Sequence, residues 1–263
     1  MPHATMPSPI TSESTTKAGK LSRADAVLLA RVAEAAERYD DMLIYTRIFV
    51  HLPLTSDASV DGERSLISIA YQNNMSSLRR ARRMALCVPP DSRAQAYGKR
   101  IEEEIMRLGE EVLDVVQKVL LPQYTNDEGK VFYIKMQADY HRYLAELLPP
   151  TPSSPRSQST HATSATTLYT AALSLASQHL LPTDPVRLGL LLNYSVFQYD
   201  ILSDVRSAWI CAKQAYDEAL EELDTLSEEG YRNAVVVVRL LRDNLQTWLP
   251  EVQALDEAVE GVE

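Results

Sequence analysis

The chain has 263 residues with 45% hydrophobic and 24% charged side chains, which is the composition of a globular protein. Its formal net charge of −10 argues against a general nucleic-acid binder, because such proteins need a basic surface that displaces phosphate counterions. Only 8 glycines argue against a turn-rich all-β fold, and no apolar run approaches the roughly 20 residues that span a bilayer.

The first 21 residues are rich in Pro, Ser and Thr and are predicted to form a disordered tail. From residue 22 onwards apolar residues recur three and four apart, which predicts a single all-α domain over residues 22–250. Breaks at Pro, Gly or Ser/Thr clusters delimit nine helices. These are expected at 22–36, 38–51, 62–86, 92–121, 127–148, 163–181, 186–203, 206–226 and 231–249. Residues 251–263 are predicted to form an acidic C-terminal tail.

Residues 149–167 read PPTPSSPRSQSTHATSATT and are predicted to form a flexible loop inserted in one domain, because consecutive helices of one array flank it. Cys87 and Cys211 are the only cysteines and lack zinc-type spacing. They predict a reducing compartment, the cytoplasm or the nucleus. No cofactor or metal is expected, since the five histidines also lack ligand spacing.

The helix predicted at 127–148 carries a charged stripe. Lys135, Asp139 and Arg142 share one face, because positions i, i+4 and i+7 lie together on an α-helix, and Tyr143 lies beside them. Such a charge-mixed face is suited to holding an anion.

A second stripe, on the helix predicted at 62–86, holds Gln72, Arg79 and Arg83. Arginine suits phosphate because its planar fork meets two oxygens at once. The run RRARR at 79–83 is also typical of a solvated face or a nuclear-import patch. A nuclear protein that contacts nucleic acid through this run is therefore a further hypothesis, and it predicts steep salt dependence of binding to any duplex.

Two apolar stripes on later helices contain embedded asparagines, Asn193 and Asn244. The stripes comprise Leu192, Asn193, Val196 and Asp200, and Leu240, Asn244, Thr247 and Trp248. Apolar residues at this spacing are normally core, but a buried amide costs free energy unless it is hydrogen-bonded. The stripes by themselves therefore indicate core, and the two embedded asparagines are the feature that a purely apolar core does not explain.

Five blocks of this chain resemble the 14-3-3 family, in the family's order. They are ERYDDM at 37–42, ERSLISIAYQN at 63–73, VFYIKMQADYHRYLAE at 131–146, the block LPTDPVRLGLLLNYSVFQYDIL at 181–202, and KQAYDEALEELDTLSEEGYRNAVVVVRLLRDNLQTW at 213–248. The resemblance implies nine antiparallel helices in a cup-shaped subunit with an amphipathic groove. It implies an adaptor in signal transduction that binds client segments containing phosphoserine or phosphothreonine.

The resemblance also implies roles for individual residues. Arg79, Arg142 and Tyr143 match the family's phosphate-binding residues, and Lys135 matches a lysine that lines the same groove. Asn193 and Asn244 match the asparagines that bond the client backbone. The apolar client side chains are expected to meet Leu192, Val196, Leu240 and Trp248.

This sequence departs from the family's pattern within the groove. Gln72 stands where the family has a pocket lysine, in AYQN instead of AYKN. Thr247 replaces a leucine, Asp200 a glutamate, and Leu78 an arginine. The alternative interpretation is therefore a structural or heterodimerising subunit with weakened phosphate binding.

The family's dimer contacts have counterparts on two predicted helices. Arg38 and Asp41 match one side of the interface, and Tyr97, Arg100 and Glu104 match the other. These residues predict a homodimer, or a heterodimer with other family members. The phosphorylatable serine that many members carry at this interface corresponds to Ala81. The partners expected are thus phosphorylated clients and a second subunit, with no nucleic acid and no membrane.

Catalysis finds no support in the sequence. It contains no GxSxG, HExxH, P-loop or dinucleotide-binding glycine pattern. Paired carboxylates such as Asp40 and Asp41 are typical of solvated helix faces. The chain is therefore not expected to be an enzyme.

Overall fold

A computed structural model describes residues 21–53, 60–89, 91–123, 126–147 and 159–260. Over these residues the chain forms nine α-helices and no strand, which confirms the predicted all-α fold and the number of helices. The helices are α2 (Arg23–Ala35), α3 (Tyr39–Phe49), α4 (Val60–Leu86), α5 (Ser92–Val115), α6 (Asp127–Ala145), α7 (Thr160–His179), α8 (Pro185–Asp200), α9 (Val205–Leu223) and α10 (Glu228–Glu260). The chain divides into two compact units, up to Leu108 and from Gly109 onwards. The predicted N-terminal tail lies outside the described residues, except for Leu21.

Side-chain caps begin most of the helices where the sequence predicts them. Ser22 forms a capping box with Asp25 at the start of α2, and Asn126 caps α6. Asp184 caps α8 just ahead of Pro185, which costs no hydrogen bond because the first-turn amides have no partner within the helix. Ser159 caps α7 at Thr160, three residues before the predicted start. Residues 160–162, predicted to be loop, are therefore helical, as are residues 163–167, where the predicted loop and the predicted helix overlap.

Two helix ends differ from the prediction by more than three residues. The segment after α5 forms a π-helical turn at Val116–Leu120 and a 3₁₀ turn at Leu121–Gln123, where the sequence predicts α-helix to 121. Leu121 keeps αR dihedral angles, but Pro122 has no amide N–H to donate to a carbonyl one turn earlier, so the regular α-helical hydrogen bonds are interrupted where the winding changes. At the other end of the chain, α10 continues to Glu260, although the prediction ends it at 249, before Pro250.

Tertiary contacts account for the continuation of α10. The Tyr199 hydroxyl donates to Glu251 Oε1 at 2.7 Å, and Arg206 on α9 pairs with Asp256. Val252 is 8% exposed and belongs to the core formed with α8 and α9. These contacts hold the last turns in place beyond a proline that removes one helical hydrogen bond.

The first unit packs α2 against α3 and α4. Its core includes Ala26, Met42 and Tyr71, each with 0% of its surface exposed. A buried ion pair joins Arg23 Nη2 to Glu63 Oε2 at 2.5 Å, and Arg23 Nη1 also donates to the Phe49 carbonyl at 2.7 Å. Arg23 therefore ties the start of α2 to α4 and to the end of α3.

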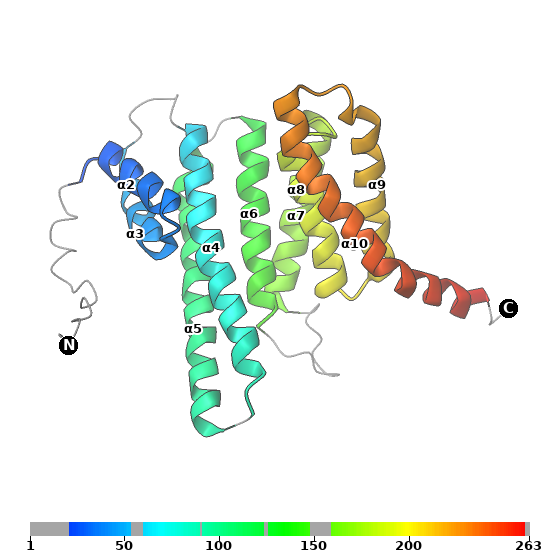
Figure 1. Cartoon of the computed structure of the whole chain (residues 1–263), viewed down its shortest axis with the longest axis horizontal. Helices are drawn as coiled ribbons and strands as arrows, with labels where there is room; N and C mark the ends of the chain where they lie inside the picture. The colour runs from blue at the N-terminus through cyan, green and yellow to red at the C-terminus, as the bar shows by residue number, and fades with distance from the viewer. Residues whose placement is uncertain (1–20, 54–59, 90, 124–125, 148–158, 261–263) are drawn as a thin grey trace, which may run out of the picture. The chain divides into compact units, whose positions relative to one another are not determined.

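The second unit is organised around α8, which contributes to two hydrophobic clusters. One cluster joins α6, α7 and α8, and the other joins α8, α9 and α10. Figure 1 shows α10 crossing obliquely over α8 and α9 within this unit. Four alanines of α7, among them Ala165 and Ala172, are buried, and their small side chains let α6 approach closely.

Candidate functional site: a buried polar network on three helices

The centre of the candidate site is the carboxylate of Asp139 on α6, which is buried. It receives Lys135 Nζ at 2.8 Å on one oxygen and the Tyr169 hydroxyl at 2.5 Å on the other. Asn193 Nδ2 donates to both oxygens at 2.9 Å. Because these partners come from α6, α7 and α8, one carboxylate fixes side chains of three helices in a common geometry.

The surroundings of Asp139 keep it ionised. Burial by itself raises the pKa of a carboxyl group, because it penalises the charged form. Here the charges of Lys135 and Arg142, with the hydrogen bonds from Lys135 and Tyr169, outweigh burial and hold the pKa of Asp139 below its ordinary value. The network therefore contains a permanent anion near neutral pH.

Arg142 is 6% exposed and is held on several sides. Its Nη1 donates to Glu146 Oε1 at 3.1 Å, and its Nε donates to the Tyr169 hydroxyl at 3.4 Å. The guanidinium carbon lies 4.5 Å from the centre of the Tyr143 ring, which is a cation–π contact. Burial works against the charge, but the neighbouring Tyr169, Tyr143, Asp139 and Glu146 raise the pKa of Arg142, so the cation persists.

The predicted stripe of Lys135, Asp139 and Arg142 is thus one connected cluster in the second unit. Within it two cations face two carboxylates, Asp139 and Glu146. Such a cluster is close to neutral, so it supplies fixed hydrogen-bond donors more than net positive charge. Binding a phosphate would need at least one further cation.

The apolar wall predicted on α8 and α10 is partly core. Leu192 and Val196 are half-buried against the α8, α9 and α10 cluster, whereas Leu240 is 48% exposed. Trp248 is only 4% exposed and stacks on Tyr199 with the ring centres 5.0 Å apart. Its ring therefore belongs to the core of α8, α9 and α10 and leaves little surface exposed.

The polar residues of the same wall differ in their surroundings. Asn193 is engaged by Asp139, as described above, and Asn244 is half-buried on α10. The Thr247 hydroxyl donates to the Asp243 carbonyl at 2.8 Å, so it is occupied by its own helix. Asp200 is exposed at the last position of α8.

Gln72 and Arg79 lie on α4, in the first unit. Gln72 is exposed and Arg79 is half-buried. Arg142 and Tyr143 belong to the second unit, so a joint clamp with Arg79 stays a prediction.

The residues predicted for dimer contacts are exposed or half-buried on α3 and α5. Arg38 pairs with Asp41, and Arg100 Nε lies 3.2 Å from Glu104 Oε1. Tyr97 is 61% exposed, which is unusual for a large aromatic side chain. The intramolecular pairs orient these charges on the surface without burying them.

The chain is similar to known proteins over most of its length. The family model for the 14-3-3 protein matches residues 29–249. A 14-3-3-like protein of Fucus vesiculosus is 40% identical over 245 residues, covering 90% of this chain and 94% of the relative. The 14-3-3-like protein G-BOX factor 14 kappa of Arabidopsis thaliana is 39% identical, with 90% and 98% covered. The checkpoint signal transducer rad25 of Schizosaccharomyces pombe is 39% identical, with 91% and 89% covered.

The chain belongs to the 14-3-3 family. Membership supports an adaptor role in signalling, with binding of client proteins and dimerisation, and the family's proteins are not enzymes. Over the residues that the structure describes, no group of three or more His, Cys, Asp or Glu side chains is placed to hold a metal ion. None of the described helices is long and apolar enough to cross a membrane.

Two features of this 14-3-3 protein were not predicted from its sequence. Tyr169 bonds both Asp139 and Arg142, yet it lies on a helix with no other candidate residue, so only the packing of α7 on α6 identifies it. Leu28 and Val32 are 59% and 56% exposed on α2. A signal for this pair did exist, because the stripe of Ala26, Ala30 and Ala33 already accounts for the buried face of that helix.

Proposed function

We propose that this 14-3-3 protein is an adaptor that binds client segments containing phosphoserine or phosphothreonine and so regulates the clients' activity or location in the cytoplasm or the nucleus. The observation that carries the proposal is Arg142, a buried cation held by Tyr169, Glu146 and Tyr143. A guanidinium fixed in this way loses little side-chain entropy on binding, and its charge-assisted bonds to phosphate are among the strong ones.

In the proposed complex Arg142, Tyr143 and Arg79 hold the phosphate, and Lys135 lines the groove beside it. Arg79 supplies the further cation that the nearly neutral cluster around Asp139 needs. Asn193 already donates its amide N–H groups to Asp139. Its carbonyl oxygen is therefore the atom left to accept a backbone N–H of the client, and Asn244 serves the client backbone in the same way.

Titration of a fluorescent phosphoserine peptide and its unphosphorylated twin, followed by anisotropy at physiological salt, tests this function. The phosphorylated peptide should bind and its twin should not. Arg79→Leu should weaken binding at least about tenfold, since a hydrogen bond to a charged group contributes roughly 1.5–3 kcal/mol. The matched control is Arg232→Leu, which removes an exposed arginine paired with Glu228 on α10. Equal affinity of both peptides for the parent protein would contradict phosphate dependence.

A second candidate function rests on Gln72, which offers an exposed amide where an ammonium group is usual. Here the protein is a structural or heterodimerising subunit whose phosphate binding is weakened about ten- to a hundredfold. The variant Gln72→Lys separates the two candidates in the same titration. Binding by the variant alone would favour the structural subunit, whereas similar affinities would favour the adaptor.

We also propose that the dimer surface extends to α2. Leu28 and Val32 lie one turn apart and are largely exposed, so burying them against a second subunit would remove apolar area from water. Val32→Asp should shift the solution mass toward that of one chain. Val236→Asp is the control, because Val236 is equally exposed at 57% but lies on α10. A Val32→Asp protein with unchanged mass would refute this surface.

A further inference from the structure

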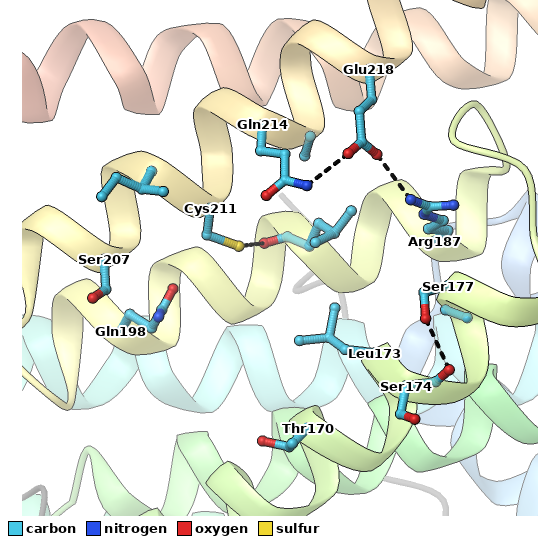
Figure 2. Close-up of a pocket in the computed structure, with 14 residues that line it drawn as sticks. Thr170, Leu173, Ser174, Ser177, Arg187, Gln198, Ser207, Cys211, Gln214 and Glu218 are labelled. Carbon is cyan, nitrogen blue, oxygen red and sulfur yellow. Dashed lines mark hydrogen bonds and ion pairs between the residues drawn. The ribbon is translucent and has the colours of Figure 1, made fainter.

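A cavity lies between α7, α8 and α9 in the second unit. Figure 2 shows this pocket, whose volume is about 610 Å³. Small-molecule sites have volumes of roughly 300–1,000 Å³. None of the residues predicted for phosphate, peptide or subunit binding lines the pocket.

Part of the pocket lining is apolar. Leu173, Leu191 and Ile210 line it, one from each of the three helices. Cys211 lies beside them, with its thiol 3.9 Å from the Leu191 carbonyl oxygen. Burial raises the pKa of this thiol to about 11, so the sulfur is neutral and adds soft apolar surface to the wall.

The charged groups of the pocket gather at one end and compensate each other. Arg187 Nη2 donates to Glu218 Oε2 at 2.9 Å, and its Nη1 donates to the Leu180 carbonyl at 3.0 Å. Gln214 Nε2 donates to the other Glu218 oxygen at 2.7 Å. Because this cation and this anion already have partners, the pocket favours a neutral ligand over a charged one.

The opposite end of the pocket holds an unsatisfied polar group. Gln198 lines the pocket there together with Ser207 (Figure 2). Gln198 is 9% exposed, and its Oε1 has no hydrogen-bond partner among the described residues. Native structures seldom leave a buried acceptor unpaired, and the terminal torsion of glutamine is broad enough to turn the oxygen toward a ligand.

We propose that this pocket binds a small neutral molecule with an apolar ring body and a hydroxyl or N–H group, which donates a hydrogen bond to Gln198 Oε1. The ring lies between Leu173, Leu191 and Ile210, and the donor lies at the Gln198 end. The site is independent of the phosphopeptide groove.

Two probes of nearly equal shape test the proposal, 2-naphthol with a hydroxyl donor and 2-fluoronaphthalene without one. Equilibrium dialysis of the full chain gives both dissociation constants. The naphthol should bind about three- to tenfold more tightly, which corresponds to one net hydrogen bond. In Gln198→Leu this preference should fall to about one, with the ring still bound. Equal affinity of both probes for the parent protein would overturn the proposal.

Further variants test where the probes bind, and urea unfolding tests whether Gln198→Leu is still folded. Ser174→Trp should fill the pocket from α7 and weaken both probes at least about tenfold. Thr163→Trp, at an exposed position of α7 outside the pocket, should leave both affinities unchanged. The urea midpoint of Gln198→Leu should equal or exceed that of the parent, and a large drop would mean that the amide is already satisfied. Displacement of 2-naphthol by a saturating phosphoserine peptide would place the probe in the groove and also refute the site.

Discussion

The substitution Asp139→Asn tests whether one buried carboxylate holds the candidate site together. The carboxylate accepts hydrogen bonds from Lys135, Tyr169 and Asn193. Asparagine preserves the shape but replaces one acceptor oxygen with an NH₂ group that faces the same donors. At least one donor then loses its partner, and the charges of Lys135 and Arg142 lose their nearest buried anion.

The expected loss in the free energy of unfolding is about 3 kcal/mol. Breaking a buried ion pair by removing one partner typically costs roughly 3–5 kcal/mol. The lower end applies because the Lys135 side chain is 19% exposed and can turn partly toward water. Asp114→Asn is the matched control, because the pair of Asp114 with Lys118 is two-thirds exposed and should contribute less than about 1 kcal/mol.

Urea unfolding at one fixed protein concentration measures both variants, because the stability of a dimer depends on concentration. The pKa of Asp139 is lower in the folded chain than in the unfolded chain, where it is about 4. The carboxylate therefore stabilises the folded state above the unfolded pKa, and this contribution is lost as the pH falls through the pKa of the folded chain. The difference between parent and Asp139→Asn should therefore narrow in strong acid. A loss below about 0.5 kcal/mol at neutral pH would refute the view that this carboxylate organises the site.

Two further predictions concern α6 and its neighbours. Burial and the adjacent His161 lower the pKa of His141 to about 4. Between about pH 6.5 and 4 the unfolded chain therefore binds a proton that the folded chain does not. The free energy of unfolding should fall by about 1–2 kcal/mol as the pH is lowered across that window, after allowing for solvent screening. The variant His141→Gln should lack this acid-dependent loss in urea titrations, and an unchanged pH profile would contradict the assignment. Gly109→Ala would place its Cβ 2.8 Å from Leu144 Cδ2. Overpacking costs roughly 1–3 kcal/mol, whereas alanine gains about 1 kcal/mol in helix propensity. We therefore expect the free energy of unfolding to fall by about 1 kcal/mol. Gly98→Ala has nothing within 4 Å of the added Cβ, so it should instead raise the free energy of unfolding by up to about 1 kcal/mol. Equal changes in the two variants would refute the close approach of Leu144 to Gly109.

Periodicity predicted the number of helices and most of their starts, because apolar spacing and capping residues act within a few neighbouring residues. Ser22, Asn126 and Asp184 are examples of such local signals. The end of α10 was predicted too early, since Pro250 is a local stop signal that contacts from Tyr199 and Arg206 override. Predictions from neighbouring residues failed where contacts with residues distant in the sequence stabilise the helix.

The candidate site shows the same division. The sequence by itself placed Lys135, Asp139 and Arg142 on one stripe, because helical geometry fixes which residues share a face. Only the tertiary structure showed that Asp139 binds Asn193 from α8 and Tyr169 from α7, and that Gln198 is buried with an unpaired oxygen beside a separate pocket. Burial, and the hydrogen bonds that compensate for it, depend on which helices pack together, and no local pattern encodes that information.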